Sequence, residues 1–159
     1  MASTLQIWRR LSAWPFGKWL FTRVVCWKAP YFGSIRPRIV ELRPGYGEVG
    51  IRKRRAVLNH IGTVHAIAIC NMAELAAGTM TDATIPATHR WIPKGMTVEY
   101  LGKAGTDLKA MAVIDPIPDF GKAMDMPVGV SVADEAGQIV FRAVITMWVS
   151  PKKTDAAEK

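Results

Sequence analysis

The chain has 159 residues, a length that favours one compact domain with a core able to fold alone. Half of the residues are hydrophobic and 21% are charged, which excludes a disordered, collagen-like or disulfide-rich chain. The formal net charge is +8 at pH 7, and residues 1–55 carry 12 basic against 2 acidic side chains. Such a basic segment fits nucleic acid, a membrane surface or an anionic ligand, and composition does not choose among them.

Only two cysteines occur, Cys26 and Cys70, and neither lies in a CxxC pair or near a cluster of histidines. This usage predicts neither a metal site nor a disulfide framework, and it is typical of a reducing compartment. We therefore expect a cytoplasmic protein.

Residues 1–33 hold 8 of the 14 aromatic side chains, interspersed with Arg9, Arg10, Lys18 and Arg23. These charges interrupt every apolar run well short of the roughly 20 residues that a transmembrane helix needs. The segment also lacks the apolar core of a signal peptide. The pattern predicts two amphipathic helical pieces joined near residues 15–17.

Three roles are open to this N-terminal segment. We expect its Trp and Phe side chains to pack onto the rest of the domain, with Lys and Arg in water. The alternative is a helix in a membrane interface through residues 1–30, because Trp combined with Lys or Arg is typical of such anchors. Binding to nucleic acid is not expected, because no recognised motif or Gly/Arg-rich arm accompanies the charge.

After Pro37 the hydrophobic period changes to two. Residues 39–43 and 48–53 are predicted to form a hairpin about the turn at Pro44 and Gly45. The alanine-rich residues 64–78 are too long for a typical buried strand. They predict a helix that is enclosed by other structure and ends at Gly78.

Four further strands are predicted at residues 96–101, 108–114, 128–132 and 139–149. A turn at residues 134–137 joins the last two. This order of elements is α+β, with one antiparallel sheet curved about one central helix. We expect an amphipathic helical segment at 1–33, the α+β domain at 34–150 and a flexible tail at 151–159.

Glu74 is the one acidic residue within the predicted helix. A carboxylate on an enclosed, apolar helix loses solvation unless hydrogen-bond donors or cations meet it. Residues 67, 71, 74 and 78 share one helix face, so Asn71 lies beside Glu74. The alternative to a chemical role is a structural carboxylate that caps a loop or pairs with an arginine.

The segment before that helix reads Asn59-His-Ile-Gly-Thr-Val-His65-Ala66. Its Asn and Gly suit a loop, and the first free N–H groups of the helix form an anion site suited to the oxyanion of an acyl transfer. We expect His65 to brace this loop rather than to act as an acid or base. His65 and Glu74 are nine residues apart, about 13 Å along a helix and half a turn out of phase. Two chains related by a two-fold axis could instead bring Glu74 of one to the loop of the other.

At these residues the chain resembles the hotdog-fold acyl-CoA thioesterase superfamily, particularly its phenylacetyl-CoA and 4-hydroxybenzoyl-CoA branches. In that superfamily the loop carries Asn or Gln, then His-Gly, then a helix with Asp or Glu nine residues beyond the His. Asn59, the His65-Ala66 pair and Glu74 have this spacing, and the likeness covers residues 34–150. The longer run 59–74, together with residues 91–100, is similar to a less characterised hotdog branch whose members are regarded as thioesterases.

The resemblance implies thioester hydrolysis at the interface of a homodimer or a dimer of dimers. Glu74 would be the general base or the nucleophile, the Ala66 amide the oxyanion donor, and Asn59 the residue that orients substrate or water. His65 belongs to the same motif. No cofactor is required, because coenzyme A is part of the substrate, and the candidates to bind its phosphates are Arg54, Arg55, Arg90, Lys94 and Lys103.

Ala66 departs from the family pattern, in which glycine follows the histidine. Its Cβ narrows the approach of the acyl group, which favours the alternative of a protein that binds acyl-CoA or acyl carrier protein without turnover, attached or not to a membrane surface. The acyl-carrier-protein dehydratases are less similar, because their His and Glu lie further apart with prolines between them.

Overall fold

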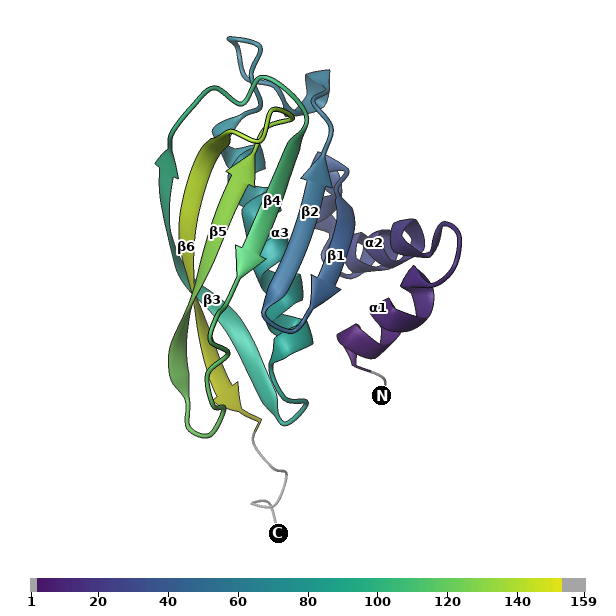
Figure 1. Ribbon diagram of the computed structural model, residues 1–159, viewed down its shortest axis with the longest axis vertical. Coiled ribbons are helices and arrows are strands. Elements are labelled where there is room, and N and C mark those ends of the chain that lie inside the picture. The colour runs from purple at the N-terminus through teal and green to yellow at the C-terminus, as the bar shows by residue number, and fades with distance from the viewer. Residues whose placement is uncertain (1–2, 153–159) are drawn as a thin grey trace.

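The computed structural model describes residues 3–152, which form a six-stranded antiparallel sheet curved around one long helix, with two more helices at one side (Figure 1). The first elements are α1 (Thr4–Ser12), α2 (Gly17–Lys28), the 3-10 helix η1 (Pro30–Ile35), β1 (Arg38–Arg43) and β2 (Tyr46–Ile51). They are followed by η2 (Arg55–Val57), α3 (Ala66–Thr84), β3 (His89–Tyr100), β4 (Leu108–Val113), β5 (Met124–Ala133) and β6 (Ile139–Pro151). Of the predicted tail, residues 153–159 lie outside the described part.

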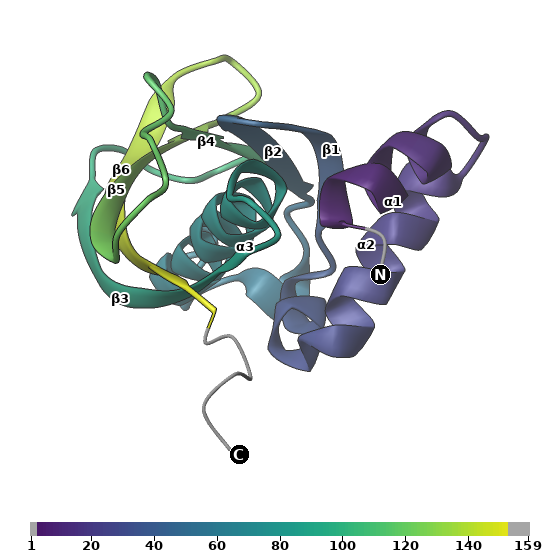
Figure 2. The same ribbon diagram turned by 90° about the horizontal axis from the view of Figure 1, so that it is seen from below.

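The strand order in the sheet is β1-β2-β4-β5-β6-β3, so β1 and β3 are its edges. All neighbouring strands pair antiparallel. Helix α3 lies along the concave face of the sheet, as Figure 2 shows from below, and 12 of its 19 residues are buried. The predicted α+β class, the hairpin β1–β2 and the four later strands are confirmed, and the arrangement is the hotdog fold.

Small side chains allow the sheet to approach α3 closely. A Cβ placed on Gly47 of β2 would lie 2.9 Å from the carbonyl oxygen of Ala76 and 2.9 Å from the Cβ of Met80. The backbone of β2 therefore touches the helix directly. Alanines along α3 supply the complementary shallow surface, and Ala73, Ala76 and Ala77 are fully buried.

The predicted end of the central helix at Gly78 is wrong, because α3 continues to Thr84 and is followed by Ile85 in extended conformation and by Pro86. Gly78 serves packing instead of termination. A Cβ at this position would lie 2.9 Å from the ring of Trp91 on β3.

Strand β3 is longer than the predicted 96–101, since it begins at His89. Pro93 and Gly95 interrupt the strand pattern in the sequence, but the structure absorbs them in a register shift between these two residues. Proline is tolerated there because β3 is an edge strand, where an amide N–H can be missing without breaking a ladder on both sides.

The two predicted N-terminal helices are confirmed, and α2 is fixed along the edge strand β1. The Trp8 and Phe21 rings meet edge to face with centroids 5.1 Å apart. The Thr22 hydroxyl accepts a hydrogen bond of 3.1 Å from the Ile39 N–H, and the Lys18 ammonium donates one of 2.7 Å to the Val40 carbonyl. Trp8 and Phe21 join the same hydrophobic cluster as the sheet and α3.

The N-terminal Trp and Phe side chains were expected to pack onto the domain, and this is confirmed for Trp8 and Phe21, which are buried. The expectation is wrong for four others, whose exposed fractions run from 62% to 85%: Trp14, Phe16, Trp19 and Trp27. Trp19 and Trp27 lie on sides of α2 that do not pack on β1, and Trp14 and Phe16 lie in the connection between α1 and α2. No helix within residues 3–152 has the length and apolarity needed to cross a bilayer.

The contact of Gly47 with α3 predicts that Gly47→Ala lowers the free energy of unfolding by about 1–3 kcal/mol, because the added methyl group overpacks a backbone contact. Urea unfolding measures the change. Gly50→Ala on the same strand is the control, since its Cβ meets nothing closer than 3.7 Å. Equal effects of the two substitutions would contradict the packing described for β2 and α3.

Candidate active site

The loop before α3 is shaped by the side chain of Asn59. Its Oδ1 accepts hydrogen bonds from the N–H groups of Ile61 and Thr63, both 3.1 Å, and its Nδ2 donates one of 2.8 Å to the Thr63 hydroxyl. Only one N–H of the amide is left for another partner. Asn59 thus holds the loop, and its role toward substrate or water stays a prediction.

His65 is the N-cap of α3. Its Nδ1 accepts a hydrogen bond of 3.1 Å from the Ile67 N–H, and its backbone N–H donates one of 2.8 Å to the Val57 carbonyl. His65 therefore braces the loop, as expected from the sequence. The capping bond also takes up one of the free amides at the start of the helix.

The Ala66 N–H is one of the amides that stay available at this helix end. Ala66 is half-buried and is the first residue of α3, and no acceptor for its N–H occurs within residues 3–152. The positive end of the helix dipole adds to the pull of this donor on a negatively charged oxygen. The loop is held in place by the bridge between Leu58 and Val64 and by a 2.8 Å hydrogen bond from the Val64 N–H to the Ala104 carbonyl.

Glu74 lies in the third turn of α3 and is half-buried. In the part of the chain that the structure describes, three ion pairs occur, and Glu74 belongs to none of them. Its carboxylate also receives no hydrogen bond from any side chain or loop amide of that part. The alternative of a capping or Arg-paired carboxylate is therefore not what a single chain shows.

Glu74 stands on the one stripe of α3 that the sheet leaves uncovered, which also includes Ile67 and Cys70. Ile67 is 56% exposed. On one side the stripe meets β3, where the Cys70 Sγ lies 3.4 Å from the Tyr100 hydroxyl. This hydrogen bond, together with partial burial, raises the pKa of Tyr100 to about 12, so the phenol is neutral at physiological pH.

On its other side the stripe meets η1. The buried Asn71 donates weak hydrogen bonds to the Tyr31 carbonyl at 3.4 Å and to the Ser34 hydroxyl at 3.3 Å. Its Oδ1 is buried and finds no donor among the described residues. Asn71, which was expected beside Glu74, thus connects α3 to η1 by hydrogen bonds.

One chain does not bring Glu74 and the loop together. Because α3 is continuous from Ala66 to Thr84, Ala66 and Glu74 stay about 12 Å apart along its axis. The separation expected from the sequence is therefore retained in the fold, and a common site requires a second chain.

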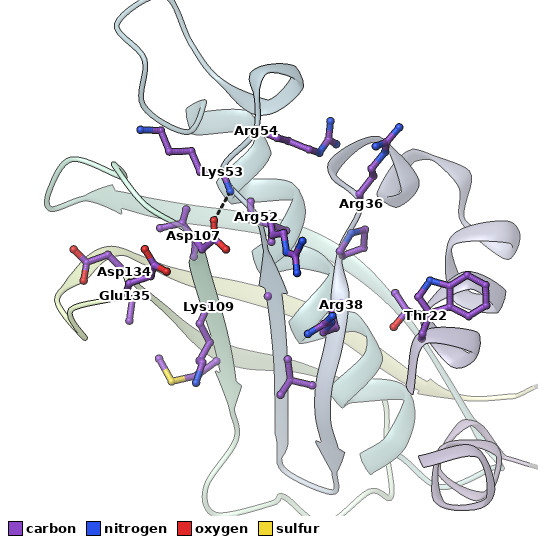
Figure 3. Close-up of a pocket in the computed structure, with 18 of the residues that line it drawn as sticks. Thr22, Arg36, Arg38, Arg52, Lys53, Arg54, Asp107, Lys109, Asp134 and Glu135 are labelled. Atoms are coloured by element: carbon purple, nitrogen blue, oxygen red, sulfur yellow. Dashed lines mark hydrogen bonds between the residues drawn. The ribbon is translucent and has the colours of Figure 1, made fainter. Parts of the chain in front are cut away.

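A second feature is a basic groove on the outer face of β1, β2 and β4, beside α2 (Figure 3). Its volume is about 1140 Å³. The basic groove is lined by seven cationic side chains, Arg23, Arg36, Arg38, Arg52, Lys53, Arg54 and Lys109, against three acidic ones, Asp107, Asp134 and Glu135. Of the seven cations only Lys109 has an ion-pair partner in the described part, Glu48 at 3.3 Å.

Of the five cations predicted to meet phosphates, only Arg54 lines the basic groove. Its Nη2 donates a 2.6 Å hydrogen bond to the Ser34 carbonyl, and its Nε is buried without an acceptor in the described part. Lys94 is paired with Asp125 at 2.8 Å. The structure does not gather these five side chains; those outside the groove are Arg55, Arg90, Lys94 and Lys103.

Three arginines of the basic groove were not among the residues predicted from the sequence to bind phosphate: Arg36, Arg38 and Arg52. The available signal was the concentration of positive charge in residues 36–55, which the turn and pairing of β1 and β2 fold onto one face. No group of three or more His, Cys, Asp or Glu side chains that could hold a metal ion occurs within residues 3–152.

Residues 17–149 match the family model described as Domain of unknown function (DUF4442). No curated protein matches the chain. Among solved structures, the genomics target APC5556 is 54% identical with a TM-score of 0.81, and the alignment covers 94% of this chain and 97% of that one.

Two more distant structures share the fold. A Pseudomonas aeruginosa protein of unknown function, PA5026, described as a probable thioesterase, is 22% identical with a TM-score of 0.75, covering 82% of this chain and 93% of that one. The thioesterase HI1161 from Haemophilus influenzae is 10% identical with a TM-score of 0.69, covering 79% and 86%. The chain has the hotdog fold and belongs to the DUF4442 family.

Proposed function

We propose that the protein is a thioester hydrolase that acts on acyl-CoA at a site formed between two copies of the chain. The observation that carries the proposal is the half-buried Glu74 carboxylate, which has no partner among residues 3–152 and stands on the uncovered stripe of α3. A partly desolvated carboxylate without a cation is suited to act as a base or nucleophile. The names of PA5026 and HI1161 point to the same class of reaction.

The chemistry needs two groups that the chain supplies. Glu74 takes a proton from water, and the oxygen of that water forms a bond to the thioester carbonyl carbon; in the nucleophilic variant the carboxylate oxygen itself forms that bond. The carbonyl oxygen becomes negative and accepts a hydrogen bond from the Ala66 N–H. The C–S bond then breaks, and the CoA thiolate leaves and takes up a proton. In the general-base variant this step releases the acid product. In the nucleophilic variant the acyl group stays on Glu74 as a mixed anhydride, which a water molecule hydrolyses to release the acid and restore the carboxylate.

The edge of the sheet supports the assembly of two copies. Strand β3 has one side without a partner strand, and the uncovered stripe of α3 runs beside it. Exposed apolar side chains occur on both elements: Ile67 on α3, Ile92 and Tyr100 on β3, and Leu101 directly after β3. An unpaired edge strand leaves backbone N–H and C=O groups without partners, and pairing with a second copy would satisfy them.

A two-fold axis at this edge would make the two α3 helices antiparallel. An axis midway between positions 66 and 74 passes beside Cys70 and places each Glu74 opposite the Ala66 N–H of the partner. The same helix that separates the two groups in one chain would then unite them across the dimer.

The basic groove supports a ligand that carries several phosphates, as coenzyme A does. Arg36, Arg38 and Arg52 have no ion-pair partner in the described part, so they are free to meet phosphate oxygens. Ser34 is contacted by Arg54 from the groove and by Asn71 from α3. Element η1 therefore contacts both the basic groove and α3.

Glu74→Gln is expected to lower kcat for a reactive acyl-CoA about 100-fold or more, because it removes the proton acceptor or nucleophile while keeping the shape of the side chain. Release of free thiol from a panel of acyl-CoAs of different chain length measures the rate. Glu99→Gln on the outer face of β3 is the control and keeps full activity. Binding of acyl-CoA with no hydrolysis by the unmodified protein would identify a non-catalytic binder instead.

The proposed axis predicts that Cys70 of one copy crosslinks to Cys70 of the other. Treatment with a short bismaleimide in a Cys26→Ser background is expected to give a covalent dimer, seen on a denaturing gel. The matched Cys70→Ser variant, which keeps Cys26, should stay monomeric on the gel. A covalent dimer that forms only through Cys26 would contradict the placement of the axis beside α3.

Arg38→Gln combined with Arg52→Gln is expected to raise KM for acyl-CoA roughly tenfold and to leave kcat unchanged, because two phosphate partners are lost. The N-acetylcysteamine thioester of the same acyl group carries no phosphate, so its KM should not change. Lys122→Gln, an exposed lysine outside the groove, is the control. An equal change in KM for both substrates would contradict the binding of phosphate in the basic groove.

A further inference from the structure

Helix α2 lies beside the edge strand β1 (Figure 2) and has a second apolar face, whose side chains are exposed instead of packed against β1. Its side chains recur every three or four residues, the spacing of one side of a helix. Together with the α1–α2 turn and the start of η1 they form what we call the aromatic face, whose members have exposed fractions between 40% and 85%: Trp14, Phe16, Leu20, Val24, Trp27 and Tyr31.

The fold holds this aromatic face outward. The opposite side of α2 is locked to the domain through buried Phe21 and through the hydrogen bonds of Thr22 and Lys18 to β1. The helix cannot turn to bury Trp27 or Leu20 without giving up Phe21 and Thr22. A surface helix that exposes a row of large apolar side chains opposite its buried face is expected to have a partner there.

The charge around the aromatic face indicates the nature of that partner. Residues 1–40 contain seven Lys and Arg and no Asp or Glu. Arg23, Lys28 and Arg36 are exposed beside the apolar side chains, and Trp19 and Arg23 lead from this face into the basic groove. The partner therefore has to combine an apolar interior with an anionic border.

We propose that the aromatic face docks on the surface of a lipid bilayer that contains anionic lipids. Tryptophan and tyrosine rings suit the boundary between head groups and acyl chains, and lysine and arginine meet the lipid phosphates. A second copy of the chain is a poorer occupant. A two-fold contact through this face would set Arg23, Lys28 and Arg36 against the same cations of the other copy, with no carboxylate in residues 1–40 to pair with them.

Docking does not depend on thioester hydrolysis, because the aromatic face shares no residue with the stripe that carries Glu74. Phe16 and Trp27 are the most informative positions, being 85% and 81% exposed. Phe16 has φ of 65°, a left-handed conformation that asparagine adopts more readily than phenylalanine. Phe16→Asn with Trp27→Ser therefore removes apolar surface without disturbing a buried contact.

The test is flotation of the full-length protein with vesicles of phosphatidylcholine alone or of phosphatidylcholine and phosphatidylglycerol. The unmodified protein is expected to float with the anionic vesicles and much less with the neutral ones. Phe16→Asn with Trp27→Ser should lower the partition coefficient roughly tenfold or more. Val144→Ser with Trp148→Ser, which removes exposed apolar groups from the outer face of β6, is the matched control and should float normally.

Three results would overturn the proposal. The first is no flotation of the unmodified protein, and the second is flotation that the Phe16→Asn, Trp27→Ser variant retains in full. The third is an oligomer that this variant dissociates in sedimentation while no form of the protein floats, which would assign the aromatic face to self-association. Hydrolase activity measured on the same variant in the absence of vesicles separates loss of docking from failure of the proposed function.

Discussion

The packing of α3 into the concave face of the sheet is the contact on which the rest of the structure depends. The two backbones approach so closely that Gly47 has no room for a Cβ against Ala76 and Met80, and Gly78 has none against the ring of Trp91. The sheet, η1 and α1 together bury all but one stripe of α3. The position of Glu74 on that stripe is thus a consequence of core packing, and so is the half-burial of its carboxylate.

Much of the fold could be predicted from periodicity, because strands β4 to β6 alternate apolar and polar residues and α3 is rich in alanine. The role of Gly78 could not, since its neighbour Trp91 comes close only through the tertiary fold. The sequence predicted the loop at Asn59 and the bracing role of His65, and it placed Glu74 on the central helix; the catalytic role of Glu74 stays a prediction. Sequence spacing missed the basic groove, because Arg36, Arg38 and Arg52 converge only through the pairing of β1 with β2.

The short helix η1 connects the aromatic face, the basic groove and the uncovered stripe of α3. It continues the chain from the aromatic face on α2, it receives Arg54 from the basic groove, and it receives Asn71 from α3. A thioester whose phosphates lie in the groove would reach the stripe of α3 across this element. A bilayer docked on α2 would lie beside the basic groove, which α2 also lines. The positive charges of the N-terminal part of the chain would then serve two partners, an anionic ligand in the groove and an anionic lipid surface at α2.

The central claim is that each site combines Glu74 of one chain with the Ala66 amide of the other, and mixing two inactive variants tests it most directly. Ala66→Pro removes only the N–H, because proline suits the first position of a helix and His65 before it is already extended, with φ of −64° and ψ of 138°. Glu74→Gln removes the carboxylate. Subunit exchange between these two variants is predicted to restore about a quarter of the unmodified activity, since half of the dimers then hold one intact site. No recovery after demonstrated exchange would place both groups in the same chain and contradict the account.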